Sequence, residues 1–143
     1  MRNFFSSSRS LRLGAIVAAA AFLACQQKSP EEELLKKVEP AGSWLASLQM
    51  TGEKWAANSA PTSFVRSSAG AARKAFEKAA EATDRSQASP ELRAALRRLI
   101  GEAQAATAGL ERAARTADRQ AAAREVGRLA ALRGEFEKLT QGG

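Results

Sequence analysis

Residues 89–117 read SPELRAALRRLIGEAQAATAGLERAARTA. Apolar or small side chains recur in this stretch at alternating spacings of four and three residues, which place them along one side of a helix. They are Leu92, Leu96, Leu99, Ala103, Ala106, Leu110, Ala113 and Ala117. Ser89 and Pro90 are typical of a helix start, because serine caps free N–H groups and proline at the first helical position needs no donor. The stretch therefore predicts an amphipathic helix over about residues 90–117.

The same alternation recurs in two further segments, which predict helices over about residues 30–57 and 60–86, and apolar residues three or four apart predict a last helix over about residues 119–139. Ser29 and Asp118 are the expected N-caps of the first and the last of these helices. The residues expected on the inner sides are Leu34, Val38, Ala41, Leu45, Leu48, Gly52 and Trp55, then Val65, Ala69, Ala72, Phe76, Ala79 and Thr83, then Val126, Leu129, Leu132, Phe136 and Leu139. Pro40 interrupts the first segment, and we expect it to kink or split that helix because it lacks an N–H group.

The composition also favours helices. Alanine accounts for 33 of the 143 residues, against 10 glycines and 4 prolines. Because the connections between the segments are short, consecutive helices are expected to run antiparallel. The predicted fold is all-α, an antiparallel, up-down-up-down four-helix bundle over residues 30–140, with Trp44 and Phe64 among the side chains that add bulk to an alanine-rich core. A coiled-coil dimer has the same spacing, so a homo-oligomer stays an alternative.

The N-terminal residues have a different character from the rest. Arg2, Arg9 and Arg12 precede an apolar run over residues 13–24. This run is shorter than the roughly 20 residues that a membrane-spanning helix needs. A basic segment followed by a short apolar run and a small residue predicts a secretory signal peptide over residues 1–24. Its removal would lower the net charge from +7 to about +4.

The apolar run ends in Phe22-Leu23-Ala24-Cys25, which contains the single cysteine of the chain. These four residues resemble the lipobox of bacterial lipoproteins. The resemblance implies transfer of a diacylglyceryl group to the Cys25 thiol, cleavage before Cys25 and acylation of the new amino group. Residues 25–29 would then form a short lipidated tether, and two or three acyl chains would hold the protein stably at a lipid bilayer. By the same family analogy, Gln26 favours the periplasmic face of the outer membrane over the inner membrane in a Gram-negative host.

Two sets of side chains are candidates for a binding surface. Trp44, Leu48 and Trp55 share one side of the first helix, either as an aromatic stripe for a ligand or partner or as part of the core, and we favour the core. A second set consists of three basic residues that are predicted to lie on one helical face and to contact anionic groups. These residues are Arg112, Arg115 and Arg119.

Acidic and basic residues that stand four apart favour a simpler interpretation of the charged surface. Such pairs usually mark a solvated helix face and contribute a few tenths of a kcal/mol each. They include Glu33 with Lys37, Glu81 with Arg85, Arg98 with Glu102, and Arg133 with Glu137.

The chain has no histidine and no tyrosine, which excludes histidine-based acid/base catalysis and histidine-ligated metal or haem. Glu53, Glu77 and Glu102 are the candidate acid/base groups of an enzyme, but all three lie outside the predicted inner sides. We therefore expect a non-enzyme with no catalytic residues, no cofactor and no metal site. Nucleic acid is not an expected partner, because no recognition motif is present.

The sequence as a whole predicts a membrane-anchored envelope lipoprotein. Its helical bundle would act as a binding, scaffold or accessory module for an envelope protein partner that the sequence does not identify. The alternative is a soluble periplasmic bundle, released by ordinary cleavage, that binds a small ligand or chaperones an envelope protein.

Overall fold

The computed structural model describes residues 27–142, which form four helices. Their bounds are α2 (Pro30–Ala56), α3 (Thr62–Arg85), α4 (Pro90–Arg115) and α5 (Arg119–Gln141). Each helix begins and ends within two residues of the range that the sequence predicts. The predicted signal peptide and the lipidation site at Cys25 lie outside the described residues.

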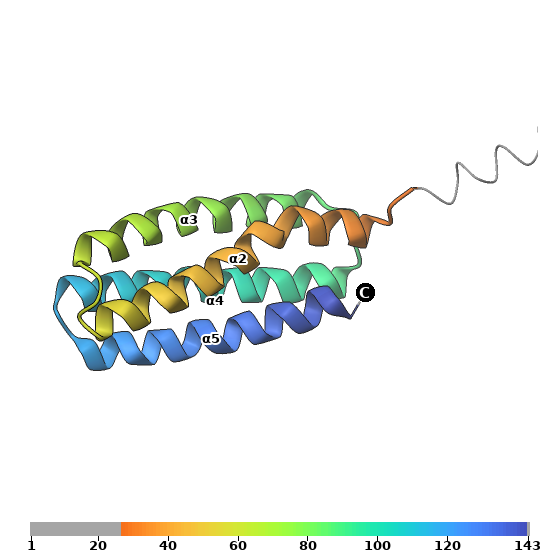
Figure 1. Ribbon diagram of the computed structural model, residues 1–143. Helices are drawn as coiled ribbons and strands as arrows, with labels where there is room; N and C mark the ends of the chain where they lie inside the picture. Colours follow the sequence, from red (N-terminus) through yellow and green to blue (C-terminus); the bar gives the residue numbers. More distant parts are fainter. Residues whose placement is uncertain (1–26, 143) are drawn as a thin grey trace, which may run out of the picture.

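Consecutive helices lie side by side and antiparallel, and α5 packs against α2 to close the bundle (Figure 1). The up-down-up-down four-helix bundle is therefore confirmed. The start of α2, the α3–α4 connection and the end of α5 lie together at one end, which we call the entry end. The α2–α3 and α4–α5 connections lie at the opposite end, which we call the far end.

Side-chain caps begin three of the four helices. The hydroxyl groups of Ser29 and Ser89 accept hydrogen bonds from the backbone N–H groups of Glu32 and Leu92, at 3.2 and 3.3 Å. The Asp118 carboxylate accepts one from the N–H of Ala121 at 2.9 Å. These caps satisfy N–H groups that have no partner within the helix, and they occur at the positions that the sequence predicts. α3 begins after Pro61 without a side-chain cap.

Both helices that end at the far end have the same C-terminal motif. In α4, the N–H of Ala117 donates to the carbonyl of Ala114, and the N–H of Asp118 donates to that of Ala113. This is the Schellman motif, in which the first residue after the C-cap adopts a positive φ. Ala117 adopts a φ of 53°, and Asn58 is the equivalent residue after α2, with a φ of 58°.

The core follows the predicted seams closely. Every predicted inner residue of α2 and α3 is buried, and Phe76 is the largest of the fully buried side chains. Leu92, Val126 and Leu139 are partly buried at its edge. Phe64 was expected to add bulk to the core, and this prediction is wrong. Its side chain is 46% exposed, because Val65 is the residue of the first turn of α3 that faces inward.

Ala117 is a second departure from the predicted seam. It is exposed and lies beyond the end of α4, which stops at Arg115. Pro40 does not split α2, which continues through it from Pro30 to Ala56.

Two glycines of α2 allow a close approach of α5. A Cβ atom at Gly42 would lie 2.5 Å from Cε1 of Phe136, and one at Gly52 would lie 2.5 Å from Cγ2 of Val126. The same Cβ atom at Gly52 would lie 3.2 Å from Cδ1 of Leu110 in α4. Gly52 therefore lets α2 contact both α5 and, across the bundle, α4.

Candidate functional site

Trp55 belongs to a structural cluster at the far end. Its ring is 6% exposed, and its indole Nε1–H donates a hydrogen bond of 3.1 Å to Oγ1 of Thr62. The guanidinium group of Arg119 lies 5.5 Å from the ring centroid, a distance typical of a cation–π contact. Arg119 also donates hydrogen bonds to the carbonyl of Ala56 and the side chain of Asn58. The cluster ties the start of α5 to the α2–α3 connection.

This cluster removes Arg119 from the predicted arginine face. Because α4 ends at Arg115, Arg119 belongs to the next helix and does not continue the face of Arg112 and Arg115. The latter two side chains remain exposed in the last turn of α4. The structure therefore places two of the three arginines on one surface and the third on a neighbouring helix.

Trp44 is separated from Trp55 by the buried Leu48, so the two rings do not share an open surface. Trp44 is half-buried and lines a cavity of about 320 Å³ between α2 and α3. The other apolar residues that line this cavity are Pro40, Ala71 and Ala75. The two tryptophans thus have different environments, one inside the far end and one at the edge of a cavity.

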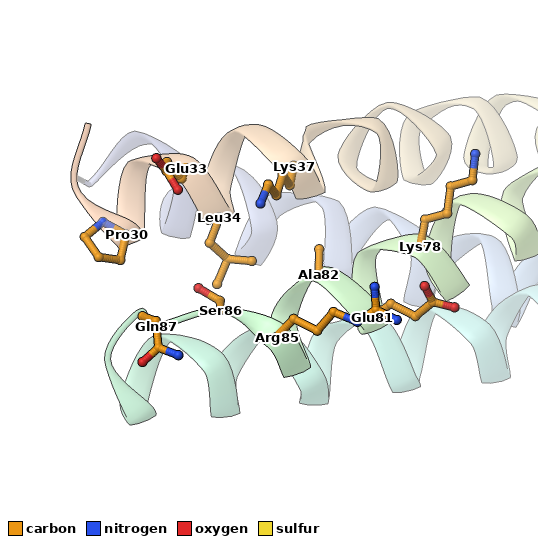
Figure 2. A pocket seen from close by; sticks show the side chains of 10 residues that line it. All are labelled: Pro30, Glu33, Leu34, Lys37, Lys78, Glu81, Ala82, Arg85, Ser86 and Gln87. Atoms are coloured by element: carbon orange, nitrogen blue, oxygen red, sulfur yellow. The ribbon is translucent and has the colours of Figure 1, made fainter. Parts of the chain in front are cut away.

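A second cavity of about 470 Å³ adjoins the first toward the entry end (Figure 2). Lys37 and Lys78 line both cavities, so the two are neighbours between α2 and α3, and together we call them the α2–α3 groove. In the second cavity Leu34 and Ala82 point toward each other from the two helices (Figure 2). Polar and charged side chains make up most of the remaining lining, which includes Glu33, Glu81, Arg85, Ser86 and Gln87.

The groove is rich in charges that have no ion-pair partner. Four basic and two acidic side chains line it, and none of the six takes part in an ion pair of residues 27–142. They are Lys37, Lys74, Lys78, Arg85, Glu33 and Glu81. The predicted pairs of Glu33 with Lys37 and of Glu81 with Arg85 therefore do not form. The excess of positive charge favours an anionic group in the groove.

Ion pairs lie on the opposite side of the bundle, along and between α4 and α5. Arg98 of α4 bonds to Glu135 of α5 at 2.6 Å and to Glu102 at 3.1 Å. These hydrogen bonds, first that to Glu135 and then that to Glu102, raise the pKa of Arg98. Arg133 and Glu137 also form the predicted pair. The α4–α5 surface thus matches the solvated, ion-paired face that the sequence predicts.

The three glutamates considered as acid/base groups do not form a second functional site. Glu53 and Glu77 are exposed, and Glu102 is half-buried in its ion pair with Arg98. Across the described part of the chain, no group of three or more acidic or cysteine side chains is placed to hold a metal ion. None of the four helices is long and apolar enough to cross a membrane.

Comparison with protein-family models, with curated proteins and with solved structures gives no match for this chain. The site therefore has to be interpreted from its own residues.

The sequence interpretation missed the groove, although a signal for it was present. On α3, Lys74, Lys78, Glu81 and Arg85 recur at spacings of four, three and four residues, just as the core residues do. A charged stripe of this kind runs beside the apolar one and faces the edge of a neighbouring helix. Spacing alone does not say which neighbour that edge belongs to.

Proposed function

We propose that this protein is an envelope lipoprotein, anchored through an acylated Cys25, whose helical bundle is a binding module that uses the α2–α3 groove. The observation that carries the proposal is the position of the groove relative to the tether. Pro30, the first residue of α2, lines the groove, and Cys25 lies only four residues before the N-cap Ser29. Four extended residues span at most about 14 Å.

A lipid on Cys25 would therefore hold the entry end of the bundle, and the groove with it, close to the bilayer. The groove has the size of ordinary ligand sites, which measure about 300–1,000 Å³. The apolar floor of the Trp44 part is also typical of such sites. These features support binding over a purely structural role.

The test of the anchor is the intact mass of the protein extracted from membranes, with Cys25→Ala as the matched control. We expect the mass of a chain that begins at an acylated Cys25, and we expect the variant to leave the membrane fraction. An unmodified mature chain in the soluble periplasm would contradict the lipoprotein proposal. It would favour instead the soluble, ligand-binding bundle.

A further inference from the structure

We propose that the α2–α3 groove binds a single anionic amphiphile, with an acyl chain in the Trp44 half, a phosphate between Lys37 and Lys78, and the rest of the polar head in the half at the entry end. This proposal deepens the proposed function and rests on it for the source of the ligand, a phospholipid of the membrane in which the protein is anchored. Shape, charge and the distribution of polar groups each contribute to it.

The two halves of the groove differ in chemistry. The Trp44 half has an apolar floor of Pro40, Trp44, Ala71 and Ala75, and its charged lining is basic only. The half at the entry end is lined mainly by polar and charged groups of both signs, such as Arg85 and Glu81. A ligand that fits both halves at once must be apolar at one end and polar at the other, because a polar group left without a partner on an apolar floor loses its hydration.

Charge complementarity defines the polar end of the ligand. Lys37 and Lys78 stand where the two cavities meet, one on each helix. An ammonium group has three donors and no acceptor, and neither lysine has an acidic partner within the described residues. A phosphate bound between them would accept charge-assisted hydrogen bonds from both helices. Glu33 and Glu81 also line the groove, but the four basic side chains outnumber them, so an anionic head offsets the remaining positive charge and a zwitterionic head does not.

The position of Trp44 supports the apolar end. Its half-buried ring packs against the core and keeps one side available in the cavity. The alanines opposite, Ala71 and Ala75, leave room that larger side chains would fill. An acyl chain would cover this apolar surface, at about 25 cal/mol for each Å² removed from water.

The experiment is native mass spectrometry of the purified full-length mature protein, with dioctanoyl phosphatidylglycerol and dioctanoyl phosphatidylcholine as probes. We expect a one-to-one adduct with the anionic lipid and little with the zwitterionic one. The Lys37→Gln/Lys78→Gln variant should bind the anionic lipid about ten- to thirtyfold more weakly, since a basic side chain near an anionic lipid contributes about 1 kcal/mol.

Lys36→Gln/Lys54→Gln is the matched control, because it removes the same charge from exposed positions of α2 outside the groove. Circular dichroism establishes that both variants keep the helical fold. Equal losses in the two variants would overturn the proposal in favour of general charge attraction. Equal adducts with the two lipids would overturn it as well.

Two further probes test the nature of the occupant. Glycerol 3-phosphate has the head chemistry without the chains, and competition as strong as that of the full lipid would mean a phosphate site and overturn the amphiphile. An acidic amphipathic peptide that binds where neither lipid does would mean a protein partner and overturn it too. The mass of the denatured chain reports acylation of Cys25 separately, so a failed anchor and an empty groove give different results.

Discussion

At the scale of single residues, the packing of the bundle depends on glycines, which lack a side chain. A Cβ atom added to Gly52 of α2 would lie 2.5 Å from Val126 and 3.2 Å from Leu110, so Val126 would have to move. Gly101 of α4, in contrast, has nothing within 4 Å of the position of a Cβ atom. The same substitution at these two positions therefore has opposite consequences.

We expect Gly52→Ala to lower the free energy of unfolding by about 1–3 kcal/mol, because the new methyl group overpacks a branched side chain in the core. Gly101→Ala should raise it by about 0.5–1 kcal/mol, since alanine loses less backbone entropy in a helix. Urea denaturation followed by circular dichroism measures both. Two variants of equal stability would mean that α2 and α5 do not need the glycine contact.

Ala117 is an alanine in a conformation that favours glycine. Its φ of 53° places it in the left-handed region, which costs an L-residue about 1–2 kcal/mol. Ala117→Gly should remove this cost in the folded state. Glycine also raises the entropy of the unfolded chain, which offsets part of the gain, so we expect the free energy of unfolding to rise by about 0.5–1 kcal/mol. The matched control is Ala123→Gly, at an exposed position inside α5, where we expect a loss of about 1 kcal/mol. A loss in both variants, measured by thermal denaturation, would contradict the left-handed conformation of Ala117.

At the scale of the elements, α2 is unusual because it continues through a proline. Pro40 has no N–H group to donate to the carbonyl of Lys36, and its ring crowds that carbonyl. The helix persists because its seam from Leu34 to Trp55 is buried on both sides of the proline. Tertiary packing thus outweighs a local preference, as is common for helices in proteins.

Replacing this proline should therefore stabilise the bundle. We expect Pro40→Ala to raise the free energy of unfolding by about 1–3 kcal/mol, because alanine restores the hydrogen bond and a better helix propensity. Glu39→Ala, at the exposed neighbouring position, should change it by less than about 0.5 kcal/mol. A less stable Pro40→Ala protein in the same denaturation assay would show that the packing of α2 needs the proline.

The four helices could be predicted from sequence because each carries a seam of apolar or small side chains, and three of them also have a capping residue at the start. Ser29, Ser89 and Asp118 supply that start for three helices. The end of α4 was hard to predict because its left-handed residue is an alanine, for which sequence gives no indication. Phe64 was misplaced because its size was given more weight than its position one residue outside the seam.

The candidate site was harder to predict than the fold, and the reason is physical. A seam can be recognised within one helix, whereas a groove depends on which faces of two helices meet and where small side chains leave space between them. Trp44 and Lys37 come from α2, while Lys78 and Ala75 come from α3. The sequence predicted that the two tryptophans belong to the core, and this holds for Trp55 but only in part for Trp44.

At the scale of the whole molecule, the seams of the four helices are buried against one another within a single chain. The large apolar side chains that remain exposed among residues 27–142 are Met50 and Phe64. A stable homodimer buries roughly 800 Å² on each partner around an apolar centre, which two separate side chains do not supply. We therefore expect the bundle to be a monomer that unfolds in one cooperative step.

The two tryptophans make this expectation testable, because they report on different parts of the molecule. Trp55 lies inside the far end, and Trp44 lies beside the groove. If the bundle is one cooperative unit, urea unfolding followed by tryptophan fluorescence must coincide with that followed by helical circular dichroism, for the protein and for its Trp44→Phe variant. Sedimentation should give the mass of one chain. The midpoint of urea unfolding should not depend on protein concentration. A midpoint that rises with concentration would mean that unfolding is linked to dissociation, and that a second copy covers a surface which a single chain leaves open.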